Sequence, residues 1–357
     1  MRRLLPICLL IGAVVAVQLV TEVSDTRYYL TQLTMAAYYC LLIIGLSVLM
    51  GYAGQISLGH AGFFAIGGYL SAALTTHNLI EYNQAGLVQA LQQLGLLVST
   101  QDIYGSSLLV VAPWAAALAA VCAAALIAWL LGIPVLKLKG HYLAMATLGF
   151  GIIVYRVALA SSYFGEADGI SEVPPFQLPF GLAVSGDFSA RVENYYIAWG
   201  VLIIGLILLR NLIDSRVGRA LRAIHAAPEA AEAMGVDTAR FKLKVFVISA
   251  VYAAVAGVFL THYNGGIGPS EAGVMKSVRY VAIVAVGGMA NLNGALLMGV
   301  VLSFMSLRGV FGTYDDAVFG LILIVIMLFA PKGVLSLNPL ARVRATIGRR
   351  RLSREGG

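Results

Sequence analysis

Residues 29–69 decide the fold class, and they read YLTQLTMAAYYCLLIIGLSVLM followed by GYAGQISLGHAGFFAIGGY. The first part, Tyr29–Met50, is apolar throughout and carries no charged side chain. A helix that crosses a bilayer needs about 20 mostly apolar residues. We therefore predict a transmembrane helix over Tyr29–Met50, and a break in the glycine-rich segment before the next helix.

The composition extends this prediction to the whole chain. Of its 357 residues 60% are hydrophobic and only 11% are charged, and the mean hydropathy is +0.87. Soluble domains carry roughly a quarter charged residues. The 39 glycines suit transmembrane helices that pack closely. These values exclude an ordinary soluble protein and predict an all-α, polytopic membrane protein.

Ten segments are apolar and long enough to be candidate spans, some of them broken by glycine-rich stretches. They are Leu4–Val20, Tyr29–Met50, Ala61–Thr76, Leu108–Gly132, His141–Ala160, Asn194–Leu209, Val245–Tyr263, Val278–Met289, Gly294–Leu307 and Ala317–Ala330. Arg2 and Arg3 before the first run also suit a secretory signal. That run lacks a clear small-x-small cleavage site, so an uncleaved first helix is expected.

The charges of the connections predict the orientation. Lys and Arg gather in 136–140, in 210–244 and in the tail 341–357, whereas acids dominate 77–107 and 161–193. Because Lys/Arg-rich loops stay in the cytoplasm, both termini and the connection 210–244 are expected there. The other two segments are expected outside, in the periplasm. We expect one transmembrane domain over 1–340 and a basic cytoplasmic tail over 341–357.

The net charge of +7 predicts contact with the lipid bilayer and not with nucleic acid, because the positive residues lie between apolar spans. The three cysteines, Cys8, Cys40 and Cys122, are far apart and show no disulfide or metal-ligand pattern. The sequence contains no G-x-x-x-x-G-K-[ST] motif and no H-E-x-x-H motif. The chain is therefore expected to need no cofactor or metal and to be no enzyme in its own right.

The glycine-rich stretch Gly51–Tyr69 is the first candidate site. A glycine lowers helix stability by about 1 kcal/mol relative to alanine, so a continuous helix through Gly51–Gly59 is not expected. Broken backbone at membrane depth persists where it is buried in protein or lines a wet cavity. The stretch either lines a transport path or forms a tight turn before a closely packed helix, and His60 suits a packing role. The candidate path residues here are Gly51, Gly54, Gln55, Ser57, Gly59 and His60.

A second glycine-rich stretch, Val286–Gly299, lies in the other half of the chain. Interrupted segments in corresponding halves point to a transport site, although only the pattern is shared and not the residues. The candidate path residues here are Gly287, Gly288, Asn291 and Asn293.

The strongest local pattern lies between the spans, in RVGRALRAIHAAPEAAEAMGVD over 216–237. Pro228 suits a first helical position, Gly235 suits a helix end, and Asp237 suits the cap of the next helix. The pattern predicts a helix, a short helix from Pro228 to Met234 and a third helix. A two-turn helix is too short to be stable alone, so it is expected either to dock into another protein or to be a plain connector.

These residues resemble a known family. Glu229, Ala230, Ala231 and Gly235 match the EAA loop of ABC importer permeases, whose short coupling helix inserts into an ATPase subunit. Gly51–Tyr69, His141–Phe150 and Gly287–Gly299 resemble the LivH/LivM family of branched-chain amino-acid permeases. The resemblance covers about Thr34 to Gly333. It implies an inner-membrane permease that works with a second LivH-like permease, two ATPases that bind the ATP, and a periplasmic solute-binding protein.

The alternatives differ in what drives transport and in what is carried. Permeases for urea or short amides look similar, so the solute stays open. A secondary transporter driven by H⁺ or Na⁺ usually keeps an acidic residue at midplane, whereas Glu22, Glu166 and Glu271 fall in or beside loops. An intramembrane enzyme or a purely structural subunit has less support.

Overall fold

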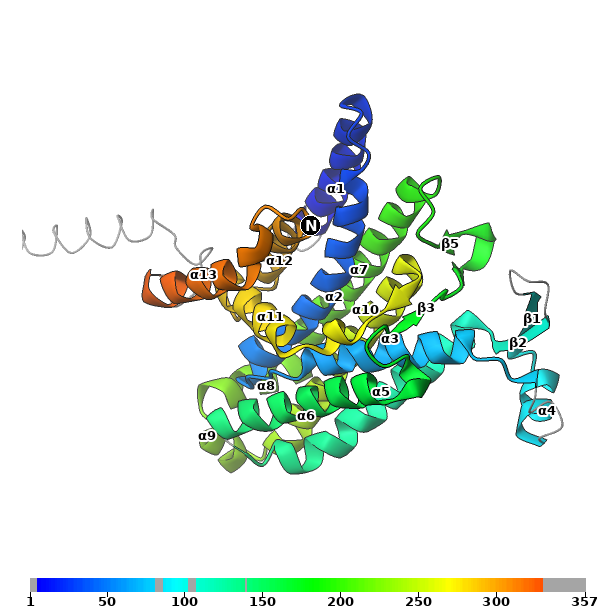
Figure 1. The fold of residues 1–357 in the computed structure, drawn as a ribbon. Helices are drawn as coiled ribbons and strands as arrows, with labels where there is room; N and C mark the ends of the chain where they lie inside the picture. Colours follow the sequence, from blue (N-terminus) through cyan, green and yellow to red (C-terminus); the bar gives the residue numbers. More distant parts are fainter. Residues whose placement is uncertain (1–4, 81–85, 102–106, 139, 330–357) are drawn as a thin grey trace, which may run out of the picture.

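A computed structural model describes residues 5–80, 86–101, 107–138 and 140–329. Its α-helices are α1 Leu5–Val23, α2 Tyr29–Ala53, α3 His60–Thr76, α4 Gly86–Gln93, α5 Pro113–Val135, α6 His141–Ala160, α7 Arg191–Asp214, α8 Arg216–Ala226, α9 Pro228–Ala233, α10 Thr238–Asn264, α11 Val274–Gly287, α12 Leu292–Leu307 and α13 Asp315–Phe329. Its strands are β1 Leu97–Gln101, β2 Ser107–Val111, β3 Ile170–Ser171, β4 Phe176–Gln177, β5 Ala183–Val184 and β6 Gly266–Ile267. Figure 1 shows the arrangement.

The helical membrane fold is confirmed, because each predicted span coincides largely with a helix, within the described residues. Among the helices that the structure describes, six are long and apolar enough to cross a membrane: α1, α2, α5, α6, α7 and α10. The other four, α3, α11, α12 and α13, have 17, 14, 16 and 15 residues. A count of ten crossings therefore stays a prediction. The predicted tail 341–357 and the residue Ala330 lie outside the described residues.

One span boundary was wrong. The apolar run was predicted to be helical from Leu108, but Leu108–Val111 belong to β2, which pairs antiparallel with β1. Leu97 is the first residue of β1 and pairs with Val111 of β2 in this hairpin. The helix α5 begins only at Pro113, which occupies its first turn. Proline is favoured there because the first N–H groups of a helix have no partner inside the helix.

Helix α2 lies at the centre of the molecule. Of the residues in its most apolar 18-residue stretch, 89% are buried. The helix packs against α7, α10 and α12. A helix that is apolar all round is buried either in protein or in lipid, and α2 is buried in protein. By contrast, only 22% of the residues in the most apolar stretch of α1 are buried, so α1 lies at the periphery.

Helices α3 and α10 form the closest seam in the core. A side chain at Gly67 would bring its Cβ within 2.3 Å of the Ala254 carbonyl oxygen, so the two backbones touch. Two histidine–serine pairs join the same helices at either end: His60 Nε2 lies 2.7 Å from Ser249 Oγ, and His262 Nε2 lies 2.8 Å from Ser71 Oγ. The seam holds α3 and α10 together as one rigid pair.

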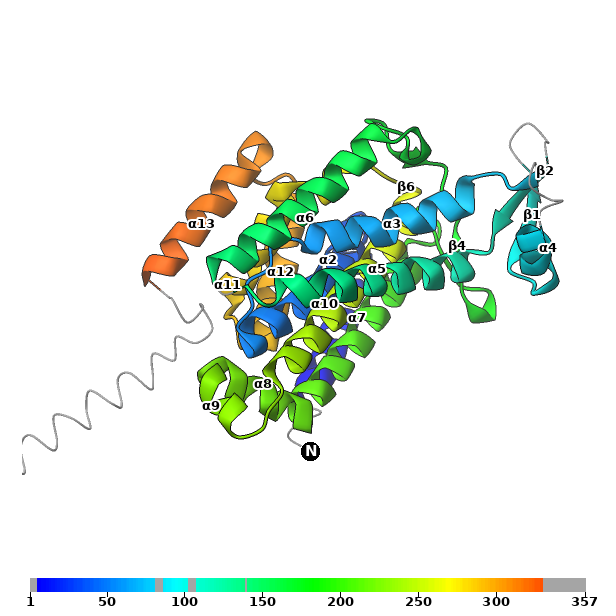
Figure 2. The same ribbon diagram turned by 90° about the horizontal axis from the view of Figure 1, so that it is seen from below.

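The connections gather at two opposite ends of the molecule. The ring of His77, from the predicted outer segment 77–107, lies 4.1 Å from that of Tyr163, from the predicted outer segment 161–193. Strand β3 pairs with β6 beyond the end of α10. Helices α8 and α9 lie at the far end, opposite α4 and β1–β2 (Figures 1 and 2). The loop between α5 and α6 lines a cavity together with α9 at this end. This grouping is the one that the loop charges predict.

Candidate functional site

The segment α8–α9–α10 has the helix, short helix and helix that its sequence predicts. Ser215 begins α8, and its hydroxyl accepts the Val217 N–H at 3.1 Å. Pro228 lies in the first turn of α9, which has only six residues. Asp237 begins α10 and accepts the Arg240 N–H at 3.0 Å. The starts of α8 and α10 follow from side-chain caps, because caps satisfy N–H groups that the helix itself leaves free. The start of α9 follows from Pro228, whose missing N–H costs nothing in a first turn.

One face of α9 is anchored and the other is presented to its surroundings. Ala231 is buried, and the Glu232 carboxylate accepts a hydrogen bond from the Thr238 hydroxyl. Glu229 and Ala230 are exposed, and Met234 just after the helix is 85% exposed. Gly235 then has a φ of +81°, which a residue with a side chain rarely adopts. The helix thus stands at the surface, with an apolar and acidic outer face.

The two glycine-rich breaks meet each other. Helix α2 ends before Gly54, which has a φ of +67°, and α3 begins at His60, so the predicted break is confirmed. A side chain at Gly51 would place its Cβ 1.6 Å from the Met289 carbonyl oxygen. The Tyr52 hydroxyl donates to the Ala290 carbonyl at 3.1 Å. Stretches that are about 240 residues apart in the chain are therefore in direct backbone contact.

The second break also provides polar side chains at this place. Asn291 begins α12 and accepts the Gly294 N–H at 3.1 Å. Arg210, at the end of α7, donates to the Asn293 side chain. With Tyr52, these residues line a cavity of about 450 Å³. The structure therefore places Asn291 and Asn293 beside Tyr52, close to the contact of Gly51 with Met289. The role of these residues in a transport path stays a prediction.

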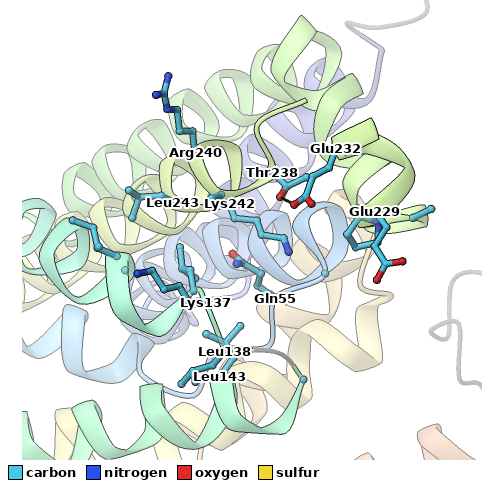
Figure 3. A pocket seen from close by; sticks show the side chains of 18 residues that line it. Gln55, Lys137, Leu138, Leu143, Glu229, Glu232, Thr238, Arg240, Lys242 and Leu243 are labelled. Atoms are coloured by element: carbon cyan, nitrogen blue, oxygen red, sulfur yellow. Dashed lines mark hydrogen bonds between the residues drawn. The ribbon is translucent and has the colours of Figure 1, made fainter. Parts of the chain in front are cut away.

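The first break also contacts the segment α8–α9–α10. A Cβ at Gly54 would lie 2.7 Å from His225 Nδ1 in α8. Gln55 is only 4% exposed and lines a cavity of about 800 Å³ together with Pro228, Glu229 and Glu232 of α9 (Figure 3). A movement of α9 that carries α8 with it would therefore reach the break.

The remaining predicted path residues are packed inside the protein. His60 is 1% exposed, with Nδ1 3.0 Å from Ser57 Oγ and Nε2 on Ser249. A Cβ at Gly59 would lie 2.6 Å from the Thr147 carbonyl oxygen. Gly287 lies against the start of α12, and Gly288 turns the chain with a φ of +97°. For Ser57, Gly59 and His60 the contacts match the packing interpretation and not the path interpretation.

Sequence reasoning missed an ion pair at the opposite end. Glu271 follows α10, as expected for a residue beside a loop, but Lys276 Nζ lies 2.5 Å from its Oε1. The Tyr39 hydroxyl lies 3.4 Å from both Glu271 oxygens. Nearby, Arg279 pairs with Asp315 at 2.7 Å. A charged residue inside an apolar helix points to a partner, and Lys276 and Arg279 in α11 carried that signal.

Within the described residues, no group of three or more His, Cys, Asp or Glu side chains could hold a metal ion. The site consists of a short surface helix, two glycine-rich turns in contact with each other, and a cavity that the first turn shares with the helix.

Comparisons with known proteins agree with this description. The family model for the permease component of branched-chain amino acid transport systems matches residues 28–329. The high-affinity branched-chain amino acid permease protein LivM of Salmonella typhimurium is 30% identical over 85% of this chain and 69% of its own length. LivH of Escherichia coli is 27% identical over 88% and 98% of the two chains, and BraD of Pseudomonas aeruginosa is 26% identical over 89% and 99%. No solved structure matches the chain.

Proposed function

The chain belongs to the family of permease components of branched-chain amino acid transport systems, and from this premise we propose that it is the transmembrane permease subunit of an ABC importer. It moves branched-chain or related hydrophobic amino acids inward across the bacterial inner membrane. Partner ATPase subunits hydrolyse the ATP, and α9 passes their movement to the membrane helices.

The contact of α8, which leads directly into α9, with the first glycine-rich break is the observation that carries this proposal. Gly54 lies against His225 of α8, and Gln55 shares a cavity with Glu229 and Glu232 of α9. Because the second break contacts the first at Gly51, a push on α9 that moves α8 would reach both. Packed elements move as rigid bodies between discrete arrangements. Docking of α9 into an ATPase would thus convert closure of the ATPase pair into opening of the path.

The exposed residues of α9 are suited to such docking. Alanines and Met234 present a small apolar surface, and Glu229 adds one charge. A helix of six residues gains too little from its own hydrogen bonds to be stable alone. A groove in a partner would stabilise it. We propose that the partners are a second LivH-like permease, two ABC ATPases and a periplasmic solute-binding protein.

The test of this function is uptake by the complete importer in proteoliposomes. The chain is co-expressed with the second permease and the two ATPases of its operon. Solute-binding protein loaded with leucine is added on the periplasmic face of the importer. We expect leucine to accumulate only when ATP is present on the face that carries the ATPases. Uptake by the chain alone, driven by an ion gradient, would refute the proposal. ATP-driven uptake of urea but not of leucine would keep the ABC importer and replace leucine by urea as the transported solute.

The coupling role of α9 is tested by Glu229→Lys. We expect at least a tenfold loss of ATP-driven uptake and loss of co-purifying ATPase, because the exposed carboxylate is replaced by an opposite charge at the docking surface. Glu172→Lys, at an exposed acid at the opposite end, is the matched control and should retain the ATPase. Wild-type uptake by Glu229→Lys would rule out this role.

A further inference from the structure

The cavity of about 800 Å³ beside α9 has the composition of a ligand site. Its walls come from the end of α5, the start of α6, α9 and the start of α10, together with Gly54 and Gln55. Ligand sites in proteins are concave, mostly apolar and about 300–1,000 Å³ in volume, with a few polar groups that converge. This cavity has all four properties.

Gln55 provides a buried acceptor without a partner. The residue is 4% exposed, and within the described residues its Oε1 accepts no hydrogen bond. Its side chain points into the cavity (Figure 3). A buried polar atom left unpaired costs about 1–3 kcal/mol. A ligand with an N–H or O–H donor would recover that energy.

The charged side chains around Gln55 carry both signs. Lys137 and Lys242 line the same cavity as Gln55, and Lys242 extends toward Gln55 (Figure 3). Their positive charges suit a carboxylate. Glu229 and Glu232 line the side formed by α9, and they suit an ammonium group. The fifth charged residue in the wall, Arg240, is held by Asp237 at 2.8 Å. A purely anionic ligand would meet the two carboxylates, whereas a zwitterion satisfies both signs.

The rest of the wall is aliphatic. The branched side chains in it are Ile133, Leu136, Leu138, Leu143 and Leu243. Burial of apolar surface against such a wall stabilises a ligand by about 25 cal/mol for each Å² removed from water. An aliphatic side chain on the ligand would fit this wall.

We propose that this cavity binds an aliphatic α-amino acid on the side of the membrane where α9 lies. The carboxylate lies between Lys137 and Lys242, the ammonium group donates to Gln55 Oε1 and faces Glu232, and the aliphatic chain packs on Leu138 and Leu143. This inference rests on the proposed function, because it makes the transported solute the ligand of a second site at the exit side.

Occupancy of the cavity acts on transport by linkage. A ligand stabilises the conformation to which it binds best, and this ligand contacts both α9 and the first break. Because the transport cycle has to leave that conformation, bound amino acid slows it. The solute that accumulates inside thus inhibits its own entry.

The experiment uses the complete importer in proteoliposomes, with its ATPases facing outward so that ATP and leucine can be added to their side. The binding protein with labelled leucine is enclosed inside, and efflux from the lumen measures transport. The variants are Lys137→Gln and Lys242→Gln. Lys244→Gln is the matched control, because it lies two residues further along α10 and does not line the cavity.

We expect unlabelled leucine on the ATPase side to inhibit transport by the wild type and by Lys244→Gln. In Lys137→Gln and Lys242→Gln the half-inhibiting concentration should rise at least tenfold, with transport in its absence unchanged. No inhibition of the wild type, or equal inhibition of all three variants, would overturn the inference. In either case, ATP-driven transport measured without added leucine would leave the proposed function intact. Only the absence of this ATP-driven transport in the wild type would refute the proposed function.

Two analogues of leucine test the zwitterion. 4-Methylpentanoate lacks the ammonium group, and isoamylamine lacks the carboxylate. Each should inhibit at least tenfold more weakly than leucine. Equal inhibition by 4-methylpentanoate, or an inhibition that follows the content of phosphatidylglycerol and not leucine, would overturn the assignment in favour of an anion or a lipid.

Discussion

At the scale of single residues, the contact between Gly51 and Met289 joins the two halves of the site. The composition of each break was predictable from the sequence, because glycine disfavours helix and asparagine favours caps. That they touch was not predictable, because a contact between residues so far apart depends on how α2, α11 and α12 pack. Sequence patterns specify turns and caps, which are local.

The first prediction concerns this contact. Gly51→Val places atoms where the Met289 carbonyl lies, so the breaks have to separate. Overpacking of this kind costs about 1–3 kcal/mol, and we expect a melting temperature several degrees lower and much weaker uptake. Gly149→Val, in α6 with open space around it, is the control. Equal melting temperatures for the two variants would contradict the close contact.

The second prediction concerns Gly235. Its φ is +81°, and no atom lies near the position of a Cβ, so backbone strain alone opposes a side chain there. A β-branched residue is disfavoured in that conformation, whereas asparagine tolerates it. We expect Gly235→Val to reduce uptake and ATPase co-purification several-fold, and Gly235→Asn to retain both. If Gly235→Val and Gly235→Asn had the same effect, the backbone conformation at residue 235 would not be the reason for the glycine there.

At the scale of elements, α8, α9 and α10 were predictable and the hairpin β1–β2 was not. Pro228 at the start of α9, Gly235 after its end and Asp237 at the cap of α10 can be identified in the sequence. In the hairpin, Leu108–Val111 continue into the apolar residues of α5, and a short apolar run fits a strand or a helix equally well. Pro113 was the signal that separates the two, since it favours the first turn of a helix.

The third prediction separates the two faces of α9. Ala231 is buried and Ala230 is exposed. We expect Ala231→Leu to loosen α9 from the protein and to lower the stability of the chain by about 1–3 kcal/mol. Ala230→Leu should leave the stability unchanged and weaken only the binding of the ATPase. Thermal unfolding of the purified permease measures the first effect, and ATPase co-purification measures the second.

The outcome that would contradict this division is also specific. If Ala230→Leu destabilised the permease as much as Ala231→Leu, then α9 would be packed on both sides and would offer no docking face. The structure would then favour the plain connector as the role of this segment.

At the scale of the whole molecule, the loop charges predicted which connections lie together, and the contact of His77 with Tyr163 agrees. The number of crossings is not decided by hydropathy, because α11, α12 and α13 are shorter than a typical span. Short helices can cross in part or pack obliquely between longer ones. How these short helices lie depends on what they contact, namely α2 in the core and the charged residues of α11. These contacts form only in the folded molecule, so the sequence does not predict them.

The central claim is that α9 lies on the cytoplasmic side, where an ATPase can bind it. Met234→Cys and Leu94→Cys, at positions 85% and 70% exposed at opposite ends of the molecule, are introduced singly into a variant without Cys8, Cys40 and Cys122. Each is treated with a membrane-impermeant thiol reagent in inside-out and right-side-out vesicles. We predict labelling of Met234→Cys only in inside-out vesicles, with protection when the ATPases are bound, and labelling of Leu94→Cys only in right-side-out vesicles. Labelling of Met234→Cys from the periplasmic side would contradict the account.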